Sequence, residues 1–435
     1  MFGYYTTLAI RGLRSQVALT LLIIAAVGVG IGASMTTLTV YRGMAADPIP
    51  HKSARLFRPQ IDNFGPAGGM GPAGEDGLQD RLTYTDAIAL LQAHAAFRQA
   101  AMYATGLVIT SADPGHRPFD TYGRATSADF FAMFAVPFLY GTAWTTRDDS
   151  DHARVIVITR DLNDRFFGGA NSVGKAMTMN GEDYRIVGVL DRWQPLPRFY
   201  DLDASFGRPE DVFLPFTVAV EHKMQFGNVN CKKAGAGWDD MVRGECVWVH
   251  FWVELPTDAA AAAYRRFLDS YADEQRRSGR FQWQARTRLR NVREWLDYHH
   301  VVSTEARILV TVSFSFLFIC LLNAAGLMLA KLVGRAPDIS VRRALGASRR
   351  AIFAQCLLEA GLVGLAGGLL GLILTGLGLS GLHALVSDDV RVLLHLDALD
   401  VGIALVLAML ATIVAGVYPT WRTARLQPAS QLKTL

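Results

Sequence analysis

Apolar residues in this chain gather into four long runs instead of alternating with polar residues along its length. The runs cover residues 17–40, 306–333, 352–382 and 399–418. Each can cross the roughly 30 Å of hydrocarbon in a bilayer, which takes about 20 apolar residues in a helix. The pattern therefore predicts four transmembrane helices, of which the third is longer than one crossing requires.

The first run is the one that could instead be a cleaved signal peptide, because Arg11 and Arg14 precede it. Its apolar length exceeds that of a typical signal core, and no convincing A-x-A cleavage site follows it. We therefore expect this run to remain in the protein as a span.

The basic residues that flank the spans gather on one side of the predicted membrane, and Asp338 is the one acidic residue among those flanks. They are Arg11, Arg14, Lys331, Arg335, Arg342, Arg343, Arg349, Arg350, Arg422, Arg425 and Lys433. Cytoplasmic flanks carry such an excess of Lys and Arg. This predicts cytoplasmic segments at 1–16, 334–351 and 419–435, a large extracytoplasmic domain at 41–305 and a short extracytoplasmic loop at 383–398.

The region between the first two spans reads as a mixed α/β domain. Strand-like runs rich in β-branched and aromatic residues lie at 106–110, 154–159, 184–190 and 246–254, and helical segments at 85–95 and 258–277. The second helix has Thr257 as a cap and ends before Gly279. The fold class is therefore an α-helical membrane protein with an extracytoplasmic α+β domain, in which a β-rich insert interrupts an α/β subdomain. A glycine- and proline-rich loop at 63–74 is expected to be mobile.

Composition supports the spans and narrows the chemistry. Hydrophobic residues make up 51% of the chain and charged residues 19%, a balance that soluble domains rarely show. The net charge of +4 is small, and the four cysteines are too few for a disulfide-dense scaffold. No nucleic-acid partner is expected, whereas membrane lipids are.

Small and polar residues inside the spans predict how the helices meet. Glycines four residues apart let helix backbones approach closely in lipid. They are Gly28 and Gly32, Gly364 and Gly368, and Gly367 and Gly371. Glu359 lies one to two turns into the third span, where a structural role is favoured over ion transport; it could also reach the headgroups or pair with an arginine. Asn323 in the second span can hydrogen-bond across helices.

A short basic segment between the second and third spans carries the most specific motif. Its order is an acidic residue, Ile, a basic pair, Ala-Leu-Gly-Ala-Ser and two more basic residues, from Asp338 to Arg350. This order resembles the cytoplasmic coupling segment of FtsX-like ABC transporter permeases. The resemblance implies docking on an ATPase through Asp338, Ile339, Val341, Arg342, Arg343, Leu345, Gly346, Arg349 and Arg350. Asp338 replaces the usual glutamate, and Pro337 before it is unusual.

The outer region and the C-terminus add to this resemblance. The segments 127–134, 139–144, 165–168, 172–175 and 184–190 follow the order found in the periplasmic core domain of MacB-type permeases, and 415–429 resembles the family's ending. Residues 191–245 match poorly.

Two further motifs bear on chemistry outside the membrane. Residues 169–176 nearly spell a phosphate-binding loop, but Ala176 replaces the hydroxyl that would hold Mg²⁺, so we interpret the segment as a turn. Cys231 and Cys246 lie where disulfides persist, and we expect them to be bridged; free thiols or a metal site, with His222 or His250 as distant ligands, are the alternatives. No catalytic or metal site is otherwise expected.

The resemblance implies a bacterial inner-membrane permease of MacB/FtsX (type VII) kind. ATP and Mg²⁺ would bind a separate cytoplasmic ATPase, and this chain would pair with a second permease and move its periplasmic domain. One version is an exporter of drugs, peptides or lipid-linked cargo that works with a periplasmic adaptor and an outer-membrane channel. The alternatives are a regulator of a periplasmic enzyme such as a cell-wall hydrolase, and a sensor without an ATPase.

Overall fold

The computed structural model describes residues 16–68, 76–110, 118–205, 207, 209–233, 237–385 and 398–424. The first fifteen residues, part of the glycine-rich loop, most of the 383–398 loop and the tail from residue 425 lie outside these ranges, so the expectations for them stay predictions. The chain divides into two compact units, one of residues 1–45 with 302–435 and one of residues 46–301.

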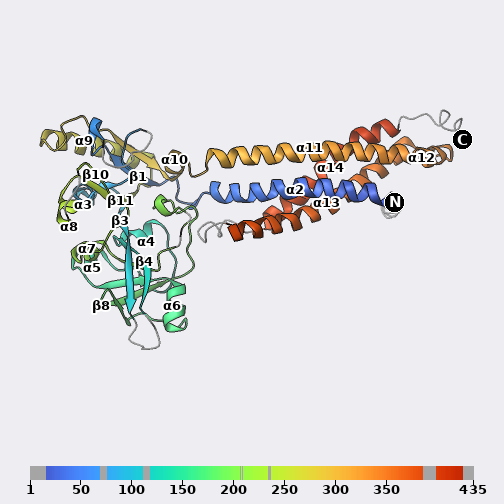
Figure 1. Cartoon of the computed structure of the whole chain (residues 1–435). Helices are drawn as coiled ribbons and strands as arrows, with labels where there is room; N and C mark the ends of the chain where they lie inside the picture. The colour runs from blue at the N-terminus through green and yellow to red at the C-terminus, as the bar shows by residue number, and fades with distance from the viewer. Residues whose placement is uncertain are drawn as a thin grey trace. The chain divides into compact units, whose positions relative to one another are not determined.

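The first unit is a bundle of long apolar helices (Figure 1). Four of them have the length and hydropathy of membrane spans. The helices of the unit are α2 (Val17–Ala45), α11 (Thr304–Gly334), α12 (Ala336–Ala344), α13 (Arg349–Leu385) and α14 (Ala398–Ala424). All four long helices extend beyond the predicted runs, because polar residues at their ends continue the helix into the flanking segments.

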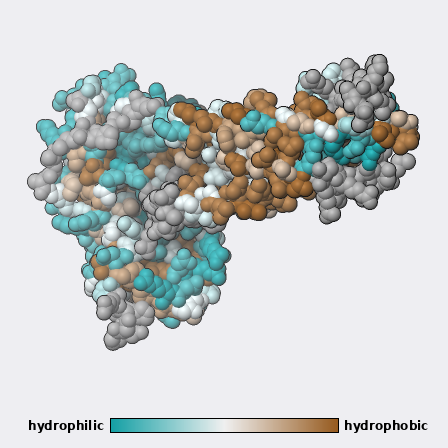
Figure 2. All heavy atoms as spheres, turned by 45° about the vertical axis from the view of Figure 1, so that its right-hand side comes forward, coloured by the Kyte–Doolittle hydropathy of each residue, from teal (hydrophilic) through white to brown (hydrophobic). Residues whose placement is uncertain are grey.

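Helix α2 lies at the centre of this packing. It runs beside α11 and α13, and α14 packs against α13 and α11. The shared core of the bundle includes Ile23, Val27, Ile31 and Met35 of α2, all fully buried. The outward side chains are mostly apolar, and Figure 2 shows them as a brown surface over the helices.

The second unit is built on one mixed sheet. Its described residues form a twelve-stranded sheet with the order β12-β1-β11-β3-β4-β9-β6-β8-β5, in which β2 and β10 also pair with β11 and β7 pairs with β3 and β8. The strands are β1 (Leu56–Ile61), β2 (Leu82–Thr83), β3 (Arg98–Thr110), β4 (Phe119–Thr126), β5 (Phe138–Gly141), β6 (Val155–Ile158), β7 (Ala176–Met179), β8 (Glu182–Leu190), β9 (Val212–Pro215), β10 (Asn230–Cys231), β11 (Cys246–Glu254) and β12 (Thr287–Asn291).

Early and late segments of the unit meet at one end of the sheet, and the middle segments form the other end. Strands β1, β11 and β12 stand at the first end, β5, β6 and β8 at the second, and the long strand β3 pairs with β11 at its start and with β7 at its finish. The predicted insert is therefore present, but as an extension of a continuous sheet.

Helices cover this sheet. They are α3 (Tyr84–Ala93), α4 (Asp129–Met133), α5 (Thr146–Ser150), α6 (Arg160–Phe167), α7 (Phe216–Glu221), α8 (Trp238–Arg243), α9 (Asp258–Arg277) and α10 (Val292–Tyr298). Helix α9 has the predicted bounds, since the Thr257 side chain accepts a hydrogen bond from the Ala260 amide and caps it.

The sheet separates two hydrophobic cores. Successive side chains of a strand point to opposite faces. In β11, Phe251 and Val253 belong to one core and Trp252 to the other. In β3, Ala101 and Tyr103 join the first core and Met102 the second. Strands buried on both faces explain why β11 reads as a continuous apolar run and not as an alternating one.

Candidate functional site

The basic segment between α11 and α13 folds as the short helix α12. Pro337 lies in its first turn, where the missing amide proton costs no helical hydrogen bond. Asp338 also lies in the first turn, where its charge complements the helix dipole. The two departures from the family pattern are thus compatible with a helix.

The Gly-Ala-Ser sequence after α12 makes the turn into α13. Gly346 has φ = +103°, a conformation that side-chain-bearing residues rarely adopt. Ala347 packs against the bundle core. The Ser348 hydroxyl accepts a hydrogen bond from the Ala351 amide at 3.2 Å and so caps the start of α13. Each residue of the motif therefore has a structural task at the turn.

Helix α12 and its C-cap residue Leu345 present an exposed apolar pair with basic residues around it. Leu345 is 83% exposed and Val341 54%, and their spacing of four places them on one face. Arg342, Arg349 and Arg350 are exposed as well, whereas Arg343 is half-buried. Ile339, which the sequence places in the same contact, is instead half-buried against the bundle core. The exposed apolar contact thus reduces to Val341 and Leu345.

Ion pairs and hydrogen bonds join α12 and the adjoining end of α11 to the neighbouring spans α13 and α2. Arg335, at the junction of α11 and α12, meets Glu359 of α13 at 3.0 Å, and Lys331 meets the same carboxylate at 2.6 Å. The Lys331 ammonium also donates to Thr20 Oγ1 of α2 at 2.8 Å. Arg342 donates to Gln355 Oε1 of α13 at 3.1 Å. Glu359 therefore joins α11 to α13, which favours a structural role for it.

The sequence identified Glu359 but not its main partner. Lys331 stood among the cytoplasmic flanking residues, yet its side chain is 3% exposed and lies inside the bundle. Spacing gave the one available signal: Lys331 and Arg335 are four apart and so share a helix face. At the other end of the bundle, Arg42 of α2 pairs with Asp400 of α14, a contact that no local pattern indicates.

The predicted glycine contacts all lie at helix interfaces. A Cβ added to any of the six would come within 3.0 Å of a side-chain atom on a neighbouring helix. The contacts are Gly28 with Leu370, Gly32 with Leu374, Gly364 with Thr412, Gly367 with Val27, Gly368 with Ala408 and Gly371 with Ile31. They join α2 to α13 and α13 to α14 within one chain.

Asn323 is placed differently from these glycines. It is exposed on α11, and its side chain has no hydrogen-bond partner among the described residues. The predicted hydrogen bond to another helix is therefore absent within the described part of this chain.

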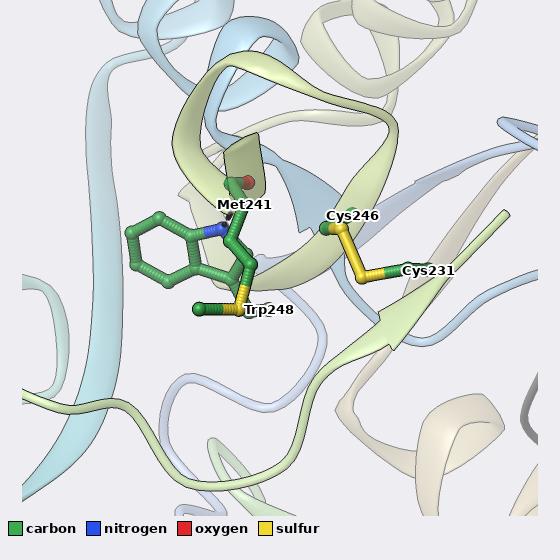
Figure 3. The surroundings of a disulfide bond; sticks show 4 residues. All are labelled: Cys231, Met241, Cys246 and Trp248. Atoms are coloured by element: carbon green, nitrogen blue, oxygen red, sulfur yellow. Dashed lines mark hydrogen bonds between the residues drawn. A yellow bond between two sulfur atoms is a disulfide. The ribbon is translucent and has the colours of Figure 1, made fainter. Parts of the chain in front are cut away.

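A disulfide joins Cys231 of β10 to Cys246 of β11, the pair expected from the sequence (Figure 3). The two residues lie directly opposite each other in antiparallel strands. Trp248, two residues further along β11, donates from its indole nitrogen to the Met241 carbonyl at 3.3 Å. The bridge attaches β10 to β11, and this hydrogen bond attaches α8 to β11. Cys320 and Cys356 are buried free thiols, as packing residues would be.

The segment that resembles a phosphate-binding loop is a turn between α6 and β7. It does not open a helix, which a phosphate-binding loop requires. Lys175 lies over the Phe167 ring at 5.0 Å, so its ammonium already has a partner.

A buried ionic cluster in the second unit was not foreseen from the sequence. Arg124 is fully buried and pairs with Asp201 at 2.6 Å and with Glu210. Burial opposes ionisation of the Glu210 carboxyl, but Arg124 and Arg198 outweigh it and hold the pKa of Glu210 below its usual range. The members are scattered over 86 residues of sequence, so no local motif reveals them.

One edge of this cluster has donor groups that could suit a metal. Ligand atoms of Asp201, Asp203 and His250 lie within 4.8 Å of one another. However, Arg58 approaches His250 Nδ1 at 2.8 Å, and Arg81 donates to His250 Nε2 at 3.3 Å. Burial, with these arginines, lowers the pKa of His250 well below its ordinary value. Guanidinium groups thus occupy the positions that a cation would need.

The protein is a membrane protein of four apolar helices, with one large α/β domain inserted after the first of them. Comparison with known families is more specific. The model of the MacB-like periplasmic core domain matches residues 20–268, and that of the FtsX-like permease C-terminal region matches residues 310–428. The chain belongs to the MacB/FtsX-like family of ABC permeases.

Individual relatives are distant. The chain is 27% identical over 309 residues to the macrolide export ATP-binding/permease protein MacB of Agrobacterium fabrum, and 25% identical over 321 residues to that of Wolinella succinogenes. These matches cover 70% and 73% of this chain but 42% and 44% of the relatives, so the chain spans less than half their length. The crystal structure of the periplasmic region of MacB from Actinobacillus actinomycetemcomitans aligns with 59% of the chain and 96% of that structure, at 12% identity and a TM-score of 0.38.

Proposed function

We propose that this chain is the permease subunit of an ABC transporter and works with a separate cytoplasmic ATPase. The observation that carries the proposal is the exposed pair of Val341 and Leu345 on α12, surrounded by arginines. An 83% exposed leucine beside polar residues is a contact that a protein partner can bury. An amphipathic helix that lays apolar anchors into a groove is a common mode of recognition.

The proposed orientation places α12, both termini and the ATPase in the cytoplasm. It rests on the excess of Lys and Arg around the segments 1–16, 334–351 and 419–435. The unit of residues 46–301 then lies in the periplasm, in keeping with its family match.

We further propose how docking would move the periplasmic domain. A force on α12 passes through Arg335 and Glu359 to α13, and through Lys331 to Thr20 of α2. Helices α2 and α11 continue along the chain into the two ends of the second unit at residues 46 and 301. The ATP-bound ATPase dimer needs only to favour one arrangement of these helices over another to shift the population.

Export from the periplasm is the favoured activity, since the curated relatives are named macrolide exporters. The cargo would be a drug, a peptide or a lipid-linked molecule, and a periplasmic adaptor and an outer-membrane channel would be the further partners. ATP and Mg²⁺ would be held by the ATPase and not by this chain. The rival is a regulator that activates a periplasmic enzyme.

Affinity purification from native membranes tests the proposal. The full-length tagged chain, solubilised in mild detergent, should bring down an ABC ATPase and support ATP hydrolysis. A copurifying adaptor would support export, and a copurifying cell-wall hydrolase would replace export by regulation. Purification of intact, inserted chain without an ABC ATPase, both with and without ATP, would contradict the permease assignment.

A further inference from the structure

A cleft lies between α12 and the first turns of α13, at the end of the bundle where α11 meets α12. Its volume is about 360 Å³, enough for a small ligand, since sites for such molecules start at roughly 300 Å³. Leu332 of α11, Ile339 of α12 and Ile352 of α13 form the apolar part of its wall. Three helices of the same unit thus build this cleft, which is called the α12–α13 cleft below.

Two arginines supply the basic part of the wall. Arg335 and Arg342 both line the cleft, and Arg342 is exposed. Arg335 pairs with Glu359 of α13 at 3.0 Å, and Arg342 donates to Gln355 Oε1 of α13 at 3.1 Å. Gln355 and Glu359 line the cleft as well. These contacts fix both guanidinium groups beside the cleft.

Positive charge exceeds negative charge around the cleft. Glu359 is shared by Arg335 and by Lys331, which approaches the same carboxylate at 2.6 Å. One carboxylate therefore compensates only one of these two cations. Arg342 and an exposed carboxylate, Asp338, also line the cleft. Three cations thus face two carboxylates, and a ligand with a single negative charge would restore the balance.

The position of the cleft indicates which anion it would hold. Leu332 and Ile352 belong to helices with the length and hydropathy of membrane spans, and the basic helix α12 lies directly beside them. The cleft thus lies at the boundary between an apolar and a basic surface. A phospholipid has the matching chemistry, because a phosphate diester with one negative charge is joined to an apolar glyceride. Arginine is suited to phosphate oxygens, and basic pockets between membrane helices bind anionic headgroups.

We propose that the α12–α13 cleft binds the headgroup of one anionic phospholipid. Its phosphate accepts hydrogen bonds from Arg342 and Arg335, and its glycerol end lies against Leu332 and Ile352. The lipid then contacts α11, α12 and α13 together and holds α12 to the bundle. This inference rests on the membrane placement in the proposed function, and it adds a lipid requirement to the helix on which the ATPase would act.

Two other occupants differ from a phospholipid in what they would contact. An ATPase docked on α12 would bury Val341 and Leu345, and Leu345 does not line the cleft. A free phosphate ion would use the two arginines but would leave the apolar wall uncovered. The experiment therefore uses the chain without an ATPase and compares lipid with inorganic phosphate.

Alkylation of Cys356 reports whether the cleft is occupied. Cys356 lines the cleft and is 8% exposed, whereas Cys320 is 7% exposed and lies against Gly30 of α2. The full-length chain is placed in nanodiscs of phosphatidylcholine with increasing phosphatidylglycerol, and a small permeant maleimide is followed by peptide mapping. Because a bound ligand protects in proportion to its occupancy, phosphatidylglycerol should slow alkylation of Cys356 at least about fivefold and that of Cys320 less than about twofold.

Matched arginine variants separate a site from general attraction to an anionic surface. Arg342→Gln removes an arginine of the cleft, and Arg350→Gln removes an equally charged, exposed arginine outside it. Arg342→Gln should raise the phosphatidylglycerol content needed for half protection by about tenfold, the factor expected for one hydrogen bond to a charged group. Arg350→Gln should raise it by less than about twofold, whereas general attraction would shift both variants alike. The rate at Cys320 shows in each variant that the bundle remains packed.

Three results would overturn the lipid site. They are a Cys356 rate that phosphatidylglycerol does not change, equal shifts for Arg342→Gln and Arg350→Gln, and full protection by inorganic phosphate in pure phosphatidylcholine. The last result would assign the cleft to a free anion. No ATPase is present in these measurements, so their failure would leave ATPase docking on α12 to its own test.

Discussion

The two units hold themselves together by opposite means. The unit of residues 46–301 uses large side chains and buried charges: Trp248, Trp252 and Trp295 are at most 1% exposed, and so is Arg58. The helix bundle uses small residues, with glycines of α2 and α13 receiving side chains of the facing helix. In water, burial of apolar area drives packing, so large groups serve best. In lipid, close backbone approach replaces that force, so small groups do.

The two units also differ in which side chains remain exposed or unpaired. In the second unit, the buried Arg124 is paired with the carboxylates of Asp201 and Glu210. The first unit exposes the apolar side chains of Val341, at 54%, and Leu345, at 83%, at the C-terminal end of α12. We infer that this exposed pair, rather than the paired buried charges, marks where another protein binds.

The largest stability effect is expected at the ionic cluster. Arg124→Met should lower the free energy of unfolding of the second unit by about 3–5 kcal/mol, because it leaves two buried carboxylates without their main partner. Seven of the eight tryptophans lie in this unit, so tryptophan fluorescence during urea unfolding of the full chain in detergent reports on it. The matched control, Arg288→Met at an exposed position of β12, should change it by less than about 0.5 kcal/mol. Equal urea midpoints for both variants would contradict the proposed contribution of the ionic cluster to stability.

Lower pH should reduce the difference in unfolding free energy between the wild type and Arg124→Met. The lowered pKa of Glu210 contributes stability that is present above its unfolded value of about 4.3 and is lost as the pH falls below it. Arg124→Met removes this contribution, so the difference between wild type and variant should shrink between pH 5 and pH 3, as estimated from that unfolded value. If the difference in unfolding free energy stayed constant over this range, Arg124 would not be what lowers the pKa of Glu210.

Loss of the disulfide should have the next largest effect on the free energy of unfolding of the second unit. Replacing Cys231 and Cys246 by Ser together should cost about 3 kcal/mol, the value for a closed loop of about 15 residues. The same urea series measures it, and non-reducing peptide mapping of wild type should recover the two cysteines linked. Free thiols in unreduced protein, or an unchanged midpoint, would remove the bridge from the account.

A smaller effect is expected in the bundle, where a glycine is replaced. Gly371→Leu should cost about 1–3 kcal/mol, because its Cβ would stand 2.6 Å from Ile31 Cγ2. The alkylation rate of the buried thiols Cys320 and Cys356 by a membrane-permeant reagent reports the loosening. Gly376→Leu on the same helix meets open space and serves as the control. Similar alkylation of both variants would show that the small-residue contact does not hold α2 to α13.

The sequence predicts those structural features that depend on residues close together in the chain, and misses those that depend on distant residues. Glycines four residues apart, the spans and the helix cap at Thr257 are visible within one helix, and so they were predictable. The cluster of Arg124 and Glu210 joins strands and loops far apart in the chain, and its members follow no period. The continuous sheet was not predicted for the same reason, because pairing between strands distant in the chain sets the strand order.

Helix α12 lies between these two cases, since only part of its structure has local determinants. The residue types from Asp338 to Arg350 have local conformational reasons to form a helix and an exit turn at Gly346. They could not show that Ile339 faces the bundle core while Leu345 faces outward, since that depends on how α12 lies against α13.

The docking role of α12 is tested most directly by Leu345→Asp. Lipid attraction of the neighbouring arginines would survive this change, whereas an apolar groove on an ATPase would have to bury an unpaired carboxylate. With Leu345→Met as the control that stays apolar, we expect Leu345→Asp to insert normally but to lose both copurification with the ATPase and permease-dependent ATP hydrolysis. A correctly inserted Leu345→Asp chain that retains both would contradict ATPase docking on α12.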